Sequence, residues 1–354
     1  MRENIITLIS CVAILGISIS TCFNMIVGFF NPTETNSVYE GHLAEQEVNG
    51  TAKDDSGING FLNSFSDNLA GKEEGAKVAS EVSKSTSGNT YIESDVVLLG
   101  KDNWLFLKAN DDGDPISDYQ CLYHYSDEEM AEYASKLEQE AAVINSYGCD
   151  FYILSIPNKA SVYPEYMPDT VTRESDYSKT DGFMDYLKNN TSLNVIDTKA
   201  SLVKAKESNQ VYYKTDTHYN QIGAFITVQD VLKAVTGSYE KVKNVSFNIE
   251  TENMSGDLAS LCNMEDTFCD DVKYVLDSST VSSKKKSDKK ILIVGDSFAE
   301  NAIDIYNQYF QEATYINIWS FTLEDINTYQ PDIVIWEGAE RYTDRFAWVS
   351  LTSE

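Results

Sequence analysis

Basic residues are scarce in this sequence. Its 354 residues include 27 Lys and Arg against 56 Asp and Glu, which gives a formal net charge of −29. A strongly negative field disfavours binding to the phosphates of nucleic acids and to anionic membrane surfaces. The composition therefore excludes nucleic acid as an expected partner.

Cysteine is also infrequent. The sequence has six cysteines, and no two of them have the Cys-x-x-Cys spacing of a zinc site. Cys11 and Cys22 lie in an apolar N-terminal segment, so an even number remains for the rest of the chain, which permits disulfides. The pairs that the spacing suggests are Cys262 with Cys269, across a short loop, and Cys121 with Cys149.

Charge is absent from residues 5–30, a stretch long enough to cross a bilayer as one helix. A cleaved signal peptide is the alternative, but the apolar run continues past any plausible cleavage site and no Ala-x-Ala pattern follows. Cys22 weakly suggests a lipid-modified cysteine, although Thr21 is bulky for such a site. We predict an uncleaved membrane anchor at residues 1–30. Arg2 and the terminal amine place its short flank in the cytoplasm and the rest of the chain outside.

Large apolar residues are rare between residues 31 and 90, where Glu, Ser, Asn, Gly, Lys and Thr dominate. This composition is typical of a flexible tether. We predict one folded domain over residues 91–354. Regular periodicity is lost between residues 237 and 290, and this stretch is interpreted as an insertion that carries Cys262 and Cys269.

Within the predicted domain, apolar strand-like runs alternate with amphipathic helices. A hairpin is expected at 95–107, and a helix follows Ser126, which forms a capping box with Glu129. Further strands are expected at 151–156, 193–197, 291–295, 313–319 and 331–338, with helices at 180–189, at 222–235 and between the last three strands. This alternation predicts an α/β fold with a mostly parallel sheet and helices on both faces. Sites in such sheets form at the carboxyl ends of the strands.

The stretch "ILIVGDSFAEN", residues 291–301, ends one of these strands with Gly-Asp-Ser. Ser297 can be the N-cap of the following helix, which is a common role for serine. A strand, a tight turn and a helix N-terminus also hold a serine hydroxyl among backbone N–H donors, as a nucleophile elbow requires. Ser297 is therefore a candidate nucleophile, and a base is needed to activate it.

Three histidines could supply this base. His42 lies in the predicted tether, and His124 precedes a capped helix, where a structural or surface role is expected. His218 lies in "YYKTDTHYN", two residues after Asp216. If this segment is extended, both side chains point to one face with Cα atoms about 6.6 Å apart, and Asp216 can orient the ring of His218 toward Ser297. Capping of the next helix is the alternative role of Asp216.

Four motifs, in this order, resemble a known family. "GKDNWLFL", "IPNKASVYPEYMP", "YYKTDTHYN" and "ILIVGDSFAEN" together are similar to SGNH-hydrolase-like proteins of the alginate O-acetylation type and to their DHHW-like Gram-positive relatives. The resemblance covers residues 96–342. It implies an SGNH, flavodoxin-like domain in which Asp-x-His precedes Gly-Asp-Ser, a circularly permuted order compared with ordinary SGNH esterases. It also implies a triad of Ser297 as nucleophile, His218 as base and Asp216 as its orienting partner.

Other site residues are candidates beside this triad. The family commonly has Trp after the histidine, where this chain has Tyr219, an aromatic residue that keeps the wall of the site. The N–H of Ser297 is one expected oxyanion donor, and Asn220 or Asn158 is the candidate for a second. Tyr219 and Trp104 are candidate contacts for a glycan.

The resemblance implies an extracytoplasmic O-acetyltransferase that acts through an acyl-serine. A polytopic membrane-bound O-acyltransferase would hand over the acetyl group, and hydroxyls of a cell-surface polysaccharide or exopolysaccharide would receive it. No cofactor and no metal are expected. Two alternatives stay open: a carbohydrate acetylesterase of the SGNH type, in which water takes the acetyl group, and a non-catalytic polysaccharide-binding protein.

Overall fold

The computed structural model describes residues 94–108 and 113–347. The chain divides into two units, Met1–Leu69 and Ala70–Glu354, and every described residue belongs to the second. The predicted membrane anchor at 1–30 and the predicted tether at 31–90 lie outside the described residues. In the part of the chain that is described, no helix is both long and apolar enough to cross a membrane.

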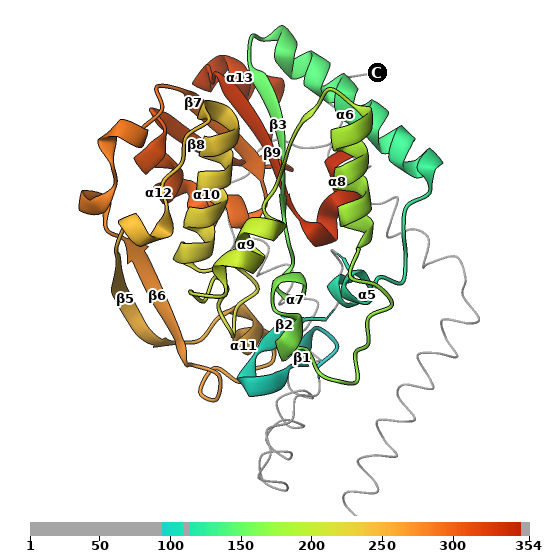
Figure 1. The fold of residues 1–354 in the computed structure, drawn as a ribbon, viewed down its shortest axis with the longest axis vertical. Coiled ribbons are helices and arrows are strands. Elements are labelled where there is room, and N and C mark those ends of the chain that lie inside the picture. Colours follow the sequence, from blue (N-terminus) through green and yellow to red (C-terminus); the bar gives the residue numbers. More distant parts are fainter. Residues whose placement is uncertain (1–93, 109–112, 348–354) are drawn as a thin grey trace, which may run out of the picture. The chain divides into compact units, whose positions relative to one another are not determined.

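A five-stranded sheet forms the centre of the described domain (Figure 1), and all of its neighbouring strands pair in parallel. The strands, in spatial order, are β4 (Asn194–Asp197), β3 (Asp150–Ile156), β9 (Ile333–Ala339), β7 (Lys290–Gly295) and β8 (Glu312–Asn317). The three central strands are rich in Ile, Val and Leu and buried, as expected for parallel strands covered on both faces. The predicted mostly parallel sheet is confirmed.

The order of these strands has the form of a permuted flavodoxin-like sheet. Counted from β7 as the first strand and continuing from β9 to β3 and β4, the spatial order is 2-1-3-4-5, the flavodoxin-like order. The direction of winding reverses between β7 and β9. Sheets of this kind place their sites in the crevice at that point, outside the carboxyl ends of the strands.

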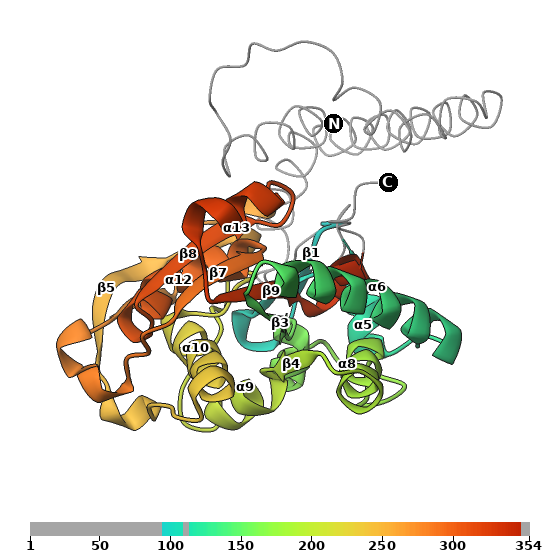
Figure 2. The ribbon, with the colours of Figure 1, turned by 90° about the horizontal axis from the view of Figure 1, so that it is seen from above.

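Helices cover both faces of the sheet, with α9 and α10 on one side and α6 and α13 on the other (Figure 2). One layer contains α9 (Lys199–Ala205), α10 (Gln221–Thr236) and α12 (Ser297–Tyr309). The other layer contains α6 (Asp127–Ser146), α8 (Lys179–Asn190) and α13 (Leu323–Tyr329). The capping box of Ser126 and Glu129 at the start of α6 is present as predicted.

Short elements gather at the end of the sheet where the central strands finish (Figure 1). They are β1 (Val97–Leu99), β2 (Leu105–Leu107), α5 (Pro115–Gln120), α7 (Lys159–Val162) and α11 (Asp257–Leu261). β1 and β2 pair antiparallel, which confirms the predicted hairpin. Asp102 and Asn103 in its turn adopt positive φ, a conformation that these two residue types tolerate better than most.

The stretch 237–290 contains structure that the sequence pattern did not predict. β5 (Phe247–Met254) pairs antiparallel with β6 (Asp271–Leu276), and α11 lies between them along the chain. β5 is exposed over all but its end residues and its register shifts twice. It therefore lacks the alternation of apolar and polar residues by which a strand is recognised.

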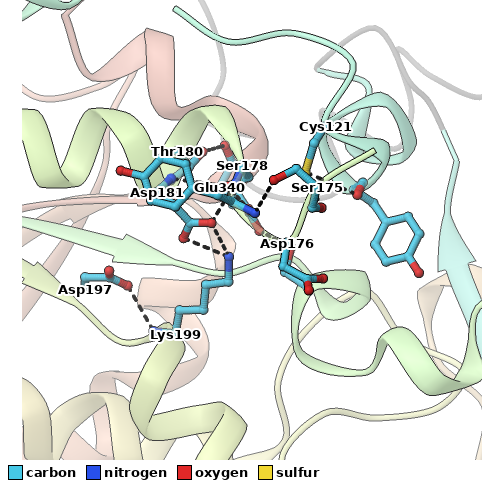
Figure 3. Close-up of polar contacts among 12 residues, drawn as sticks. Cys121, Ser175, Asp176, Ser178, Thr180, Asp181, Asp197, Lys199 and Glu340 are labelled. Carbon is cyan, nitrogen blue, oxygen red and sulfur yellow. Dashed lines mark hydrogen bonds and ion pairs between the residues drawn. The ribbon is translucent and has the colours of Figure 1, made fainter. Parts of the chain in front are cut away.

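Buried hydrogen bonds of Glu340 join the end of β9 to two other segments. Glu340 opens η7 (Glu340–Ala347), a 3₁₀ segment directly after β9. Its carboxylate accepts from the hydroxyls of Ser161, at 2.6 Å, and Ser178, at 3.1 Å, and from the N–H of Asn158, at 2.8 Å. Figure 3 shows Glu340 beside Ser178 and Thr180 at the start of α8. The loop after β3 and the start of α8 are thereby fixed to β9.

Neither of the suggested disulfides is formed, because Cys121, Cys149, Cys262 and Cys269 are all in the thiol form. The sulfur atoms of Cys121 and Cys149 each lie 3.1 Å from a different backbone carbonyl oxygen, that of Ser175 and that of Pro331. These two thiols therefore act as weak hydrogen-bond donors in separate parts of the domain.

A reducing agent is expected to leave the thermal unfolding midpoint unchanged. A native disulfide typically contributes about 2–4 kcal/mol, so its reduction would lower the midpoint by roughly 5 °C or more in a domain of this size. Scanning calorimetry with and without dithiothreitol measures the difference. Alkylation of the unfolded, unreduced protein followed by mass measurement is the control, and the four thiols should all be modified.

Candidate active site

Ser297 is the first residue of α12, directly after the Gly-Asp turn that ends β7. Asp296 is the N-cap of this helix. Its two carboxylate oxygens accept the N–H groups of Phe298 and of Ala339 at the end of β9, each at 2.9 Å. The alternative role of Ser297 as the N-cap is therefore wrong, and its hydroxyl is left for another partner.

His218 and Asp216 lie on a short loop ahead of α10. A bridge between Tyr212 and Tyr219 closes the loop, and the residues between them form bends rather than a strand. The expectation of an extended segment is wrong. The N–H of His218 donates to Oδ1 of Asp216 at 2.9 Å, and this local turn, rather than a strand face, brings the two side chains together.

The ring of His218 connects the carboxylate to the serine. Its Nδ1 lies 2.7 Å from Oδ1 of Asp216, and its Nε2 lies 2.7 Å from Oγ of Ser297. The three residues selected from the sequence thus come together from the loop before α10 and from the start of α12. Asp216 does not cap α10, because Asn220 is the N-cap of that helix.

Asp216 and His218 shift each other's pKa. Burial alone would raise the pKa of Asp216, but the hydrogen bond and the charge of His218 lower it to about 2. Burial alone would lower the pKa of His218, but the hydrogen bond and charge of Asp216, with the charge of Asp257, raise it above its ordinary value. The pair combines an ionised carboxylate with a ring that readily accepts a proton, as a general base requires.

The ammonium group of Lys159 holds this loop from inside the domain. Its Nζ donates to the backbone carbonyls of Tyr213, at 3.1 Å, Lys214, at 2.9 Å, and Asp216, at 2.6 Å. Lys159 is 4% exposed. Burial lowers its pKa to about 8, against the opposing effect of nearby carboxylates.

Hydrogen bonds from the insertion at 237–290 also fix this loop. Asp271 in β6 accepts the N–H groups of Lys214 and Thr215, both at 2.8 Å, and the hydroxyl of Thr215 at 2.6 Å. Asp257 at the start of α11 accepts the N–H of Thr217 at 2.6 Å. Neither carboxylate was a candidate from the sequence, because both lie in the part of the chain with no recognisable pattern.

Three side chains at this position could also ligate a metal ion. Asp216, His218 and Asp257 offer ligand atoms that lie within 4.8 Å of one another. Oδ2 of Asp257 is 3.6 Å from Nδ1 of His218, the atom that also contacts Asp216. An ion on Nδ1 would replace the proton of the Asp216 hydrogen bond, so metal binding there and the Asp-His-Ser arrangement exclude each other.

Asn220, a candidate oxyanion donor, has a different role in the structure. Its Oδ1 accepts the N–H groups of Ile222, at 3.0 Å, and Gly223, at 3.1 Å, and its Nδ2 donates to the carbonyl of Gln210 at 2.7 Å. The oxygen of this side-chain amide caps α10, and its nitrogen fixes the segment before the loop. This arrangement does not support an oxyanion role for Asn220.

The two aromatic glycan candidates are buried. Tyr219 is 1% exposed and Trp104 is 3% exposed, so neither ring offers a face to a glycan. Tyr219 donates its hydroxyl to the carbonyl of Phe298 at 2.6 Å and packs on that ring. Trp104 stacks on Tyr166, and the ammonium of Lys159 lies 5.8 Å from its ring centroid. Both rings instead support the segments that carry the triad.

Two further buried donor groups belong to Asn158 and Arg341, whose side chains contact each other. Oδ1 of Asn158 accepts from the guanidinium of Arg341 at 3.3 Å, while its Nδ2 finds no partner among the described residues. The guanidinium lies 5.6 Å from the ring of Phe298, the residue after Ser297, and its Nε also lacks a partner within the described part of the chain. Arg341 was not a candidate from the sequence, where it follows β9 without a recognisable motif.

A family model described as the SGNH hydrolase-like domain of the acetyltransferase AlgX matches residues 97–329. The chain belongs to this family. The match includes the Asp-x-His loop and the Gly-Asp-Ser turn, and only a short part of the described domain lies outside it. The expected resemblance to SGNH-hydrolase-like acetyltransferases is confirmed.

Curated relatives of this AlgX-type chain are similar over part of their length. A probable alginate O-acetylase AlgJ from Pseudomonas syringae pv. tomato is 23% identical over 176 residues, 49% of this chain and 42% of that protein. The probable alginate O-acetylase AlgJ of Pseudomonas aeruginosa is 28% identical over 140 residues, 38% of this chain and 31% of that protein. The chain thus matches less than half the length of either relative.

Solved structures agree with the AlgX-type fold. The O-acetyltransferase domain of Pseudomonas putida AlgJ superposes with a TM-score of 0.50 at 18% identity and covers 70% of this chain and 92% of that one. A DHHW family protein from Eubacterium siraeum gives a TM-score of 0.51 at 14% identity over 73% of this chain and 100% of that one. At these identities the likeness concerns the fold.

The ring of His218 is expected to titrate above 6.5, its ordinary pKa. Because the pKa is raised in the folded state, the charged ring stabilises the fold below pH 6.5, and this contribution is lost as pH rises through the folded value. NMR titration of ¹⁵N-labelled histidine measures the pKa, with His218→Gln to assign the resonance. The Asp216→Asn variant should titrate at lower pH. A ring that titrates at or below 6.5 in the unaltered protein would contradict the geometry.

Proposed function

We propose that this protein is an O-acetyltransferase that moves acetyl groups onto hydroxyls of a polysaccharide through an acyl-serine at Ser297. The observation that carries the proposal is the position of His218, whose two ring nitrogens each lie 2.7 Å from a partner, Asp216 on one side and the Ser297 hydroxyl on the other. The acetyltransferase description of the family and the relatives named alginate O-acetylase support the acetyl group and the polysaccharide.

In the first half of the reaction, Oγ of Ser297 attacks the carbonyl carbon of an acetyl ester, and Nε2 of His218 takes the hydroxyl proton. Asp216 holds the proton on Nδ1, so Nε2 is the free acceptor, and its charge stabilises the ring once it is protonated. His218 then gives the proton to the departing oxygen of the donor. The result is acetyl-Ser297 and a free donor hydroxyl.

The negative oxygen formed during attack needs hydrogen-bond donors. The N–H of Ser297 belongs to the first turn of α12, where helix N–H groups have no partner within the helix. Nδ2 of Asn158 is the second donor we propose, because it is buried and has no other partner among the described residues. Arg341 holds the amide of Asn158 through Oδ1 and adds a positive charge.

In the second half, a sugar hydroxyl loses its proton to His218 and attacks acetyl-Ser297, which transfers the acetyl group and restores the serine. Water can take the place of the sugar, and the enzyme is then an acetylesterase. The acyl-serine is common to both reactions. The nature of the acceptor alone separates transfer from hydrolysis.

We propose an extracytoplasmic location and a polytopic membrane-bound O-acyltransferase as the acetyl donor. The uncharged segment 5–30 supports a membrane anchor, and Arg2, the basic residue on its short flank, supports this orientation. A tethered domain outside the membrane can receive acetyl groups there and pass them to a surface glycan.

Replacement of Ser297 by Ala should abolish turnover of a chromogenic acetyl ester and the acetylated protein species seen by intact-protein mass spectrometry. Asp216→Asn should reduce turnover by about ten-thousandfold, the scale recorded for the equivalent change in a serine protease. Circular dichroism controls for folding. A folded wild-type protein that is as inert as the Ser297→Ala variant would favour the non-catalytic, polysaccharide-binding alternative.

Transfer should exceed hydrolysis when a glycan acceptor is present. Incubation of the protein with an acetyl ester donor and oligosaccharide fragments should yield acceptors heavier by one acetyl group, detected by mass spectrometry, and Ser297→Ala should yield none. Alginate oligosaccharides are one acceptor to include, with other surface glycans beside them. Release of acetate without gain by any acceptor would favour the acetylesterase.

A further inference from the structure

Asp257 has no role in the reaction proposed above, yet it lies at the ring of His218. It is the first residue of α11, in the insertion between α10 and β7. Its Oδ2 is 3.6 Å from Nδ1 of His218. This distance is too long for a good hydrogen bond, so the carboxylate acts on the ring through its charge.

Backbone contacts fix Asp257 in this position. Its Oδ1 accepts the N–H of Thr217 at 2.6 Å, and its own N–H donates to Oδ2 of Asp216 at 3.0 Å. The preceding residue, Gly256, donates its N–H to the hydroxyl of Thr215 at 2.8 Å. A Cβ on Gly256 would lie 2.3 Å from Cβ of Asp216, so only glycine allows the two segments to approach this closely.

Two carboxylates therefore face the same nitrogen of His218. Oδ1 of Asp216 lies 2.7 Å from Nδ1 of His218, and Oδ2 of Asp257 lies 3.6 Å from the same atom. Arg341 of η7 is the cation of the described residues whose charge acts on the ring, and it lowers the pKa of His218. Lys159 of α7 interacts with both carboxylates. The carboxylates outweigh the cations at the ring, because the net effect on the pKa of His218 is upward.

We propose that Asp257 is a positioning residue of this site, a second carboxylate that stabilises the protonated ring of His218 while Asp216 fixes its tautomer. The inference rests on the proposed acyl transfer, in which His218 carries the proton of Ser297 at each transition state. Asp257 takes no part in the covalent step, in which the serine proton moves to Nε2 of His218 and from there to the leaving oxygen. The insertion at 237–290 thereby supplies a charge that acts on His218, in addition to the hydrogen bonds that fix the loop before α10.

The charges of the three residues are coupled. Burial and the charge of Asp216 raise the pKa of Asp257, and the charge of His218 opposes this rise. When the ring takes the serine proton, the ionised form of Asp257 is favoured, and its charge in turn favours the protonated ring. The side chain of Asp257 is 38% exposed, so water moderates this effect.

The test compares Asp257→Asn with a matched control, Asp270→Asn. Both changes remove one negative charge from the insertion, but Asp270 pairs with Lys214 at 2.9 Å rather than facing His218. Asn at 257 keeps an oxygen for the N–H of Thr217. We expect Asp257→Asn to move the acid limb of kcat/KM for ester turnover, and the NMR titration of His218, down by up to about one pH unit, with kcat lower by about tenfold. Asp270→Asn should match the unaltered protein.

A purely structural role gives a different result. In that case Asp257→Asn resembles the unaltered protein, whereas Asp257→Ala loses activity with the His218 titration unmoved, and the inference is overturned. Activity that is lost with EDTA and restored by a divalent cation would also overturn it, in favour of a metal ion held by Asp216, His218 and Asp257. If Ser297→Ala keeps full turnover, the proposed function itself fails, and the NMR titration still decides whether Asp257 acts on the ring.

Discussion

The hydrogen bonds of the buried Lys159 ammonium are the interaction on which the rest of the site depends. The loop before α10 turns the backbone carbonyls of Tyr213, Lys214 and Asp216 toward the interior. The carbonyl of Lys214 also accepts the N–H of Leu105 in β2 at 2.9 Å, whereas the other two depend on the ammonium of Lys159. Unpaired buried carbonyls are costly, and an ammonium with three protons satisfies all three. Asp271 does the same for the N–H groups on the other side of the loop. Because its backbone is fixed from both sides, the loop can hold Asp216 and His218 in place although it is itself neither a helix nor a strand.

The strand order explains why residues so distant in sequence meet. β7 and β9 are neighbours at the point where the winding of the sheet reverses. Ser297 follows the carboxyl end of β7, Glu340 and Arg341 follow that of β9, and Asn158 follows that of the adjacent β3. The permuted chain puts the histidine loop before the serine rather than after it. The spatial arrangement of the site is unaffected, because it depends on which strands are adjacent in the sheet and not on their order along the chain.

The sequence predicted what depends on local signals. The parallel strands, the capping box of α6 and the residues Ser297, His218 and Asp216 could be identified from apolar runs, caps and motif spacing. The extended form of the Asp-x-His segment was wrong, because a side-chain bond to the N–H of His218 selects a turn. Asp257, Asp271 and Arg341 could not be identified, since the segments around them have no recognisable sequence pattern, and their roles follow only from contacts with residues distant in the sequence.

The hydrogen bonds of Lys159 also limit the reactivity of its amine. An amine with a pKa of about 8 has an appreciable neutral fraction near physiological pH, and in the acyl transfer proposed above a neutral amine that reached the acyl-serine would compete with sugar hydroxyls for the acetyl group. Each of the three ammonium protons is engaged by a carbonyl, and the indole of Trp104 lies close to the nitrogen. Loss of a proton would leave a carbonyl without its donor, and no lone pair is directed toward the serine while all three bonds persist. The same bonds that shape the loop thus keep the amine of Lys159 from acting as a nucleophile.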